Sequence, residues 1–192
     1  MDHGIETART PGDKWIEEGL RALGAGGPDA VRIEVLAKNL GVTKGGFYGS
    51  FADRNALLEA ILDRWERAST EETIARAERE GSDPKAMIRR AGLLTFSDDL
   101  RPVDLAVRDW ARRDAAVAER LRRVDNARID LLRTMIGTFC ADPDEVEARS
   151  LLAFCLAIGA HLLAADHGER TRAQVRARAS ALILDRPADP RP

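Results

Sequence analysis

The chain has 192 residues, of which 44% are hydrophobic and 32% are charged, with a formal net charge of −2. These values suit one globular unit, or a small domain joined to a larger one, and the near-neutral charge does not by itself indicate nucleic-acid binding. Cys140 and Cys155 form no CxxC pair, so we expect no disulfide framework, no metal site and no cofactor. Free thiols are typical of proteins in a reducing cytosol. The chain does not open with a basic segment followed by an apolar one, and its longest apolar run, 151–165, is short for a membrane span. We therefore expect a cytoplasmic protein.

The first predicted helix follows residues 1–9, a polar stretch that we expect to be a disordered arm. Thr10 can cap this helix, Pro11 suits its first position, and Asp13 can bond back to the cap. Apolar residues then recur at helical spacing up to Leu23. The run 24–28, which holds three glycines and a proline, predicts its end.

Two short helices and a long one are predicted next. An apolar stripe over 33–40 indicates the first, Gly41 and Val42 interrupt it, and Thr43 can cap the second, which carries Phe47 inward. Asp53 can cap a long helix that we expect to reach about Glu80.

The remaining chain also has helical periodicity and no alternating strand pattern, so the predicted fold class is all-α. Cap-plus-proline starts occur at 83–84 and 142–145, and Arg101-Pro102 predicts a break between them. We expect one long helix over 117–139, an apolar helix from about 143 to 166, and a last helix from about 169 to 184. The Pro-rich tail, 186–192, should be disordered.

Residues 31–51 have the sequence VRIEVLAKNLGVTKGGFYGSF, which predicts a helix-turn-helix. Gly41 supplies the tight turn, Ala37 lets the second helix pack closely, and Val42 and Phe47 are expected to fill the angle between the helices. The outer face of the second helix is suited to binding in the DNA major groove. Its glycines let the backbone approach DNA closely, and its polar side chains can bind phosphate oxygens. The expected DNA-contacting residues on it are Thr43, Lys44, Gly45, Gly46, Tyr48 and Ser50.

This region resembles the DNA-binding domain of TetR-type (tetracycline-repressor-like) transcriptional regulators. The resemblance rests on Leu36-Ala37, the run 41–45, Phe47-Tyr48, Phe51 and the following Asp53-Arg54-x-x-Leu57-Leu58, and it covers about residues 10–68. It implies a recognition helix over 43–49 and phosphate contacts by Tyr48 and Arg54. Gly49 and Ser50 depart from the residues usual in the family.

The resemblance also implies how the whole chain is organised. Residues 10–68 would form the three-helix DNA-binding domain, joined by the long helix to a helical ligand-binding and dimerisation domain over 69–185. The implied partners are operator DNA, a second copy of the chain and a small-molecule effector, and repression is the commoner mode of action in the family.

The net charge of the N-terminal region does not by itself indicate DNA binding. Residues 1–52 hold six Lys or Arg and seven Asp or Glu, so DNA binding must depend on a local cluster. Arg32 and Arg54 are the expected members of that cluster beside Lys44, and Arg9 could join them from the N-terminal arm.

The helix over 143–166 is apolar nearly all round, which fits either a central buried helix or a helix shared with a dimer interface. We favour the interface, where Gly159 permits a close crossing. Its expected members are Leu151, Leu152, Cys155, Ile158, Gly159, Leu162, Val175, Ala179 and Leu182. The arginines at 170, 172, 176 and 178 are expected to form a solvated helix face.

Several aromatic or flexible apolar residues lie in the middle helices. Each taken alone suits the core, whereas the family resemblance suggests that they line an effector cavity. The candidates are Leu93, Phe96, Trp110, Met135 and Phe139.

Two other classes of function are possible for an all-helical chain, a helical enzyme and a protein-binding adaptor. A helical enzyme would need a catalytic signature, but the sequence has no P-loop, HExxH, nucleophile elbow or paired Glu-x-x-His. A protein-binding adaptor would have no use for the exposed group at 43–46. The sequence therefore predicts a DNA-binding regulator without enzymatic activity.

Overall fold

The computed structural model describes residues 10–72, 75, 83–86, 88–89 and 100–185, and these contain helices, turns and loops but no strand. The prediction of an all-α fold is confirmed. Contacts divide the chain into two compact units, Met1–Ala68 with Asp98–Leu121, and Ser69–Ser97 with Arg122–Pro192. The expected arm 1–9, the tail 186–192 and the far end of the long helix near Glu80 lie outside the described residues.

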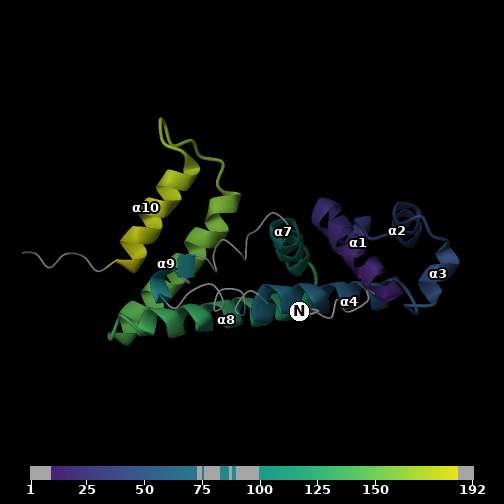
Figure 1. Ribbon diagram of the computed structural model, residues 1–192, viewed down its shortest axis with the longest axis horizontal. Coiled ribbons are helices and arrows are strands. Elements are labelled where there is room, and N and C mark those ends of the chain that lie inside the picture. Colours follow the sequence, from purple (N-terminus) through teal and green to yellow (C-terminus); the bar gives the residue numbers. More distant parts are fainter. Residues whose placement is uncertain (1–9, 73–74, 76–82, 87, 90–99, 186–192) are drawn as a thin grey trace, which may run out of the picture. The chain divides into compact units, whose positions relative to one another are not determined.

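The first unit contains the helices around the predicted helix-turn-helix (Figure 1). A π-helical turn, η2, follows α4 at Ala68–Glu72, and α8 (Ala115–Gly137) begins in this unit and continues into the second. The other elements are α1 (Pro11–Gly26), the 3-10 turn η1 (Pro28–Ala30), α2 (Ile33–Leu40), α3 (Lys44–Tyr48), α4 (Arg54–Arg67) and α7 (Leu100–Ala111).

Helices α1 and α4 begin at the capping residues that the sequence predicts. Thr10 and Asp13 form a reciprocal capping box at α1, which satisfies backbone donors that the first turn leaves unpaired. The Asp53 carboxylate accepts a 2.8 Å hydrogen bond from the Ala56 backbone N–H at α4. At the other end of α1, Gly27 has φ 71°, a left-handed value that glycine adopts without strain.

Helix α1 is the centre of the first unit, because it packs against α2, α4 and α7. Trp15 and Leu23 are buried on it. A Cβ at Gly19 would lie 2.3 Å from Ile61 Cδ1, so this glycine permits a close crossing of α1 on α4. A Cβ at Gly24 would lie 3.0 Å from Pro102 Cβ, so a second glycine brings α1 close to α7.

Arg101 and Pro102, where the sequence predicts a break in the helical pattern, are themselves helical, and residues 90–99 before them lie outside the described residues. Helix α7 begins at Leu100 and contains both residues in its first turn. The backbone N–H groups of a first turn have no intrahelical acceptor, so the missing N–H of Pro102 costs no hydrogen bond there.

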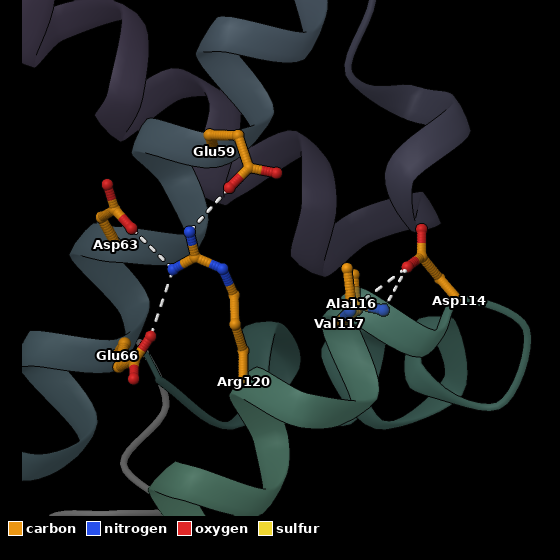
Figure 2. A network of polar contacts seen from close by, with 7 residues as sticks. All are labelled: Glu59, Asp63, Glu66, Asp114, Ala116, Val117 and Arg120. Atoms are coloured by element: carbon orange, nitrogen blue, oxygen red, sulfur yellow. Dashed lines mark hydrogen bonds and ion pairs between the residues drawn. The ribbon is translucent and has the colours of Figure 1, made fainter.

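An arginine on α8 binds three carboxylates on α4 (Figure 2). The Arg120 guanidinium donates to Glu59 and Asp63 at 2.6 Å and to Glu66 at 3.1 Å. The arginine side chain is only 18% exposed, so solvent screens this network less than an ordinary surface pair. It therefore fixes the start of α8 against one face of α4.

Replacing Arg120 with alanine should lower the free energy of unfolding by about 1–3 kcal/mol, because the three acidic groups on α4 lose their shared cation. Urea unfolding followed by circular dichroism measures the change. Arg113→Ala is the matched control, because its pair with Asp109 is about two-thirds exposed on both sides and its loss should cost little. Equal losses in the two variants would contradict the role of the network.

The second unit contains most of α8 together with α9 (Pro143–Leu162) and α10 (Arg172–Leu184), which pack against each other. Its buried core consists of Ile88, Leu132, Met135, Ile136 and Leu184. Residues 84–86 and 88–89 are helical and follow Asp83, whose carboxylate accepts a 2.9 Å bond from the Ala86 N–H. No helix in the described residues has the length and apolar character needed to cross a membrane.

Two predicted helix boundaries in this unit are displaced. Helix α9 ends at Leu162 instead of about 166, and α10 begins at Arg172 instead of about 169. Thr171 and Gln174 form a capping box that fixes the α10 start, and Gly168 has φ 62° in the connection. The T-x-x-Q pattern at 171–174 therefore places the start of α10 about three residues beyond the predicted one.

Candidate DNA-binding site

Helices α2 and α3 meet at a tight turn in which Gly41 has the left-handed φ of 67°. The Gly41 N–H donates to Lys38 O at 3.2 Å and the Val42 N–H donates to Ala37 O at 3.0 Å, so the end of α2 is closed by backbone bonds. Ala37 is buried on the face of α2, which contacts α3. The turn and the two short helices have the form of the predicted helix-turn-helix.

Phe47 fixes α3 to the rest of the unit. It is fully buried, and its ring lies edge-on to Trp15 of α1 at 5.2 Å and stacked with Phe51 at 5.7 Å between centroids. Val42 does not share this role, because 48% of its surface is exposed, so its predicted part in filling the interhelical angle is wrong. Phe47 does so with Trp15 instead.

The outer side of α3 carries the residues that the sequence predicted for DNA contact. Thr43, Lys44, Gly45, Gly46 and Tyr48 are all exposed, and Ser50 just beyond the helix is half-buried. Thr43 takes the N-cap position with extended backbone but makes no side-chain capping bond, contrary to expectation. The Tyr48 ring packs edge-on against Phe47 at 5.3 Å while the residue stays 57% exposed.

Nothing in the described part of the chain requires glycine at the two positions in α3. Positive φ among the described glycines occurs at 27, 41 and 168, and not at 45 or 46. A Cβ at Gly46 would meet nothing within 4 Å, and one at Gly45 would meet only Thr43 Oγ1 at 3.7 Å. Because glycine lowers helix propensity by about 1 kcal/mol relative to alanine, two of them in a five-residue helix are a cost that the fold does not explain.

Lys44 forms an ion pair with Glu34 of α2 across the turn. The hydrogen bond from Lys44 lowers the pKa of Glu34, and the same bond raises the pKa of Lys44, so both groups stay charged at neutral pH. Both side chains are at least half exposed. Sequence reasoning missed Glu34, because only the angle between α2 and α3 brings these two side chains together.

The two arginines expected beside α3 bond to the backbone of the preceding turn. Arg54 donates from Nε to Val31 O at 2.7 Å and from Nη2 to Pro28 O. Arg32 donates from Nε to Asp29 O at 3.2 Å and is exposed. The structure therefore gives Arg54 a bracing role that the sequence analysis did not foresee, and phosphate contact by either arginine stays a prediction.

The residues predicted for the effector cavity fall in different places. Met135 lies in the core of the second unit with Phe139 packed against it, and Lys85 Nζ lies 5.1 Å from the Phe139 ring centroid. Trp110 is half-buried on α7 in the first unit, and Leu93 and Phe96 lie outside the described residues. A cavity among these five residues stays a prediction.

The residues predicted for the dimer interface lie on α9 and α10. Leu151 and Leu152 are each 55% exposed, Leu162 is 63% exposed and Leu182 is 68% exposed. Cys155 is exposed as well, and the others are half-buried: Ile158, Gly159, Val175 and Ala179. These helices therefore present an apolar surface that the single chain does not cover.

Comparison with known proteins agrees with the form of the site. Residues 16–61 match the family model described as bacterial regulatory proteins, tetR family. This segment contains α2, the turn, α3 and the first half of α4. No curated protein matches the chain in sequence.

Solved structures share the fold over nearly the whole chain. The crystal structure of AibR in complex with isovaleryl coenzyme A and operator DNA has a TM-score of 0.65 at 15% identity, covering 91% of this chain and 98% of that one. A TetR-like transcriptional regulator from Rhodococcus sp. RHA1 has a TM-score of 0.62 at 15% identity, with 90% and 93% covered. A TetR/AcrR-family regulator from Thermobifida fusca YX-ER1 has a TM-score of 0.62 at 13% identity, with 94% and 98% covered.

The sequence match identifies the helix-turn-helix, and the structural matches show that the fold continues beyond it. Residues 16–61 therefore carry a helix-turn-helix of the tetR-family type, within a fold that the chain shares with solved TetR-family structures.

Proposed function

We propose that this protein is a cytoplasmic, homodimeric repressor that holds a palindromic operator with two copies of α3 and leaves it when a small, largely apolar effector binds. The observation that carries the proposal is the pair of glycines at 45 and 46, exposed on α3 without a structural need for them. Bare backbone at this position permits close approach to DNA. Lys44 and Tyr48 on the same short helix offer a cation and a hydroxyl for phosphate or base edges.

A second copy of the chain is the proposed partner on α9 and α10. A Cβ at Gly159 would meet nothing within 4 Å, so the described residues of the single chain do not explain this glycine, as they do not explain those in α3. The exposed leucines around it would be covered by a two-fold partner. A dimer would also place two recognition helices about 34–36 Å apart, as two successive major grooves require.

Effector release would act through the segment that follows α4. The chain passes from the first unit to the second at Ala68 and Ser69, inside the π-helical turn η2. On the far side of that point, the buried Arg128 of α8 donates to Ser69 O at 3.4 Å. Movement of α8 on ligand binding would therefore reach η2, and a coupling free energy of about 1–3 kcal/mol would change operator affinity roughly 5- to 150-fold. The structure of AibR in complex with isovaleryl coenzyme A and operator DNA supports only the premise that a protein of this fold has both kinds of ligand.

The test of DNA binding is fluorescence anisotropy with duplexes from the region flanking the gene and with a random duplex. Lys44→Ala should weaken operator binding and reduce the salt slope by about 0.9 if Lys44 meets a phosphate. It should also alter sequence preference if the ammonium reaches a base edge. Glu34→Gln should strengthen binding by about two- to tenfold, because it removes an acidic group that competes with DNA for Lys44.

The double variant Glu34→Gln with Lys44→Ala separates competition from general charge. If Glu34 acts through Lys44, the gain from Glu34→Gln should shrink in the absence of Lys44. Wild-type behaviour of Lys44→Ala on operator and on random duplex would contradict its assigned role. Failure of the wild-type protein to distinguish any flanking duplex from random DNA would contradict the proposed function.

A further inference from the structure

A cavity of about 240 Å³ lies in the second unit between α9, α10 and the helical residues at 88–89. Of the five residues that the sequence analysis predicted for an effector site, the three that the structure describes, Trp110, Met135 and Phe139, do not line it. Its volume is below the range of about 300–1,000 Å³ usual for drug-sized ligands, so a small molecule fits it. Its apolar lining includes Ile88, Ala153, Leu156, Ala157, Ile183 and Leu184.

Two guanidinium groups stand in this otherwise apolar lining. Arg89 and Arg176 both line the cavity, with the hydroxyl-bearing Ser180 as a further polar residue. Within the described part of the chain, neither arginine makes a hydrogen bond or an ion pair, and no Asp or Glu is among the residues that line the cavity. The expectation of a solvated helix face is wrong for Arg176, which is half-buried and lines the cavity, whereas Arg170, Arg172 and Arg178 are exposed.

We infer that this cavity binds a small aliphatic carboxylate, with its chain against the alanine and leucine walls and its carboxylate on Arg176 and Arg89. An arginine matches a carboxylate with two parallel N–H bonds, which are stronger than bonds between neutral groups. An organic cation would be repelled by two arginines, and a neutral chain would gain no charge-assisted hydrogen bond from either of them. The apolar walls in turn exclude a small polar anion such as inorganic phosphate as the preferred ligand.

The inference rests on the proposed function and deepens it by naming the class of effector. The cavity faces one side of α9, at Ala153, Leu156 and Ala157, while the expected dimer face, which includes Leu151 and Leu152, lies on the opposite side of the helix. A ligand between α9 and α10 would change the spacing of the two helices that carry the expected interface. Through the dimer interface, the bound ligand would thus change the distance between the two recognition helices of the dimer.

Isothermal titration calorimetry of the full chain with octanoate, octanol and octylammonium tests the site. Octanoate should bind, and both analogues should bind at least about tenfold more weakly. Arg176→Ala should weaken octanoate binding by about tenfold or more, while Arg178→Ala on the exposed surface of α10 should leave it unchanged. Ala157→Leu should reduce octanoate binding by occupying the cavity, and circular dichroism verifies that each variant is folded.

Each result has a definite meaning. Equal binding of octanol and octanoate, equal binding by Arg176→Ala and wild type, or no octanoate binding at all would overturn the inference. Operator binding is then measured with and without octanoate. Octanoate binding without loss of operator affinity would support the site and contradict the effector part of the proposed function, whereas operator binding by a protein that ignores octanoate would leave the DNA-binding part intact.

Discussion

Replacing Phe47 with alanine is expected to lower the free energy of unfolding by about 3–5 kcal/mol and to abolish operator binding. The ring is fully buried between Trp15 and Phe51, and α3 has only five residues, two of them glycine. Such a helix has almost no stability of its own, so its position depends on this one side chain. Thermal unfolding and fluorescence anisotropy with operator DNA measure the two effects.

Tyr48→Phe is the matched control for this prediction. Tyr48 is adjacent in sequence but 57% exposed, so removal of its hydroxyl should change the free energy of unfolding by less than about 0.5 kcal/mol. It should still weaken binding to all DNA sequences if the hydroxyl meets phosphate. A Phe47→Ala protein that keeps both wild-type stability and wild-type operator affinity would show that α3 is not held in this way.

Leu152→Glu should convert the proposed dimer to a monomer and weaken operator binding by about 100-fold or more, because the two recognition helices would no longer be linked. Leu152 is 55% exposed in the single chain, so the stability of the monomer itself should change little. In a dimer the same glutamate would be an unpaired buried charge. Gly159→Glu should behave alike, because the chain leaves open space at that position.

Sedimentation velocity at micromolar concentration measures this effect beside operator titration. Asn126→Glu is the control, because it adds the same charge at an exposed position of α8 outside the expected interface. That variant should remain a dimer with wild-type affinity. A wild-type protein that sediments as a monomer and still binds its operator with full affinity would refute the proposed assembly.

The parts of the fold that the sequence predicted are those set by local chemistry. The capping box of Thr10 and Asp13, the cap at Asp53 and the left-handed turn at Gly41 depend on residues within a few positions of one another. The burial of Phe47 followed from helical periodicity. These features were sufficient to place the helix-turn-helix.

Apart from local errors at helix ends, such as the cap expected from Thr43, what the sequence did not predict concerns contacts between residues distant in the sequence. Arg120 and its three carboxylates are more than 50 positions apart, and Lys44 meets Glu34 only through the angle of the turn. Val42 is likewise exposed because the Phe47 side chain, and not that of Val42, packs against Trp15 of α1. Such pairings follow from helix packing, which periodicity alone does not specify.

Arg54 fastens the turn before α2 through the carbonyl oxygens of Pro28 and Val31, which are groups that every amino acid carries. Substitutions at Asp29 or Ala30 would leave both acceptors in place, so the sequence of this turn can diverge while its shape persists. The constraint falls on position 54, where lysine would offer one ammonium in place of two separated nitrogens. Arginine at position 54 is thus required for the shape of this turn, independently of the DNA sequence that the protein binds.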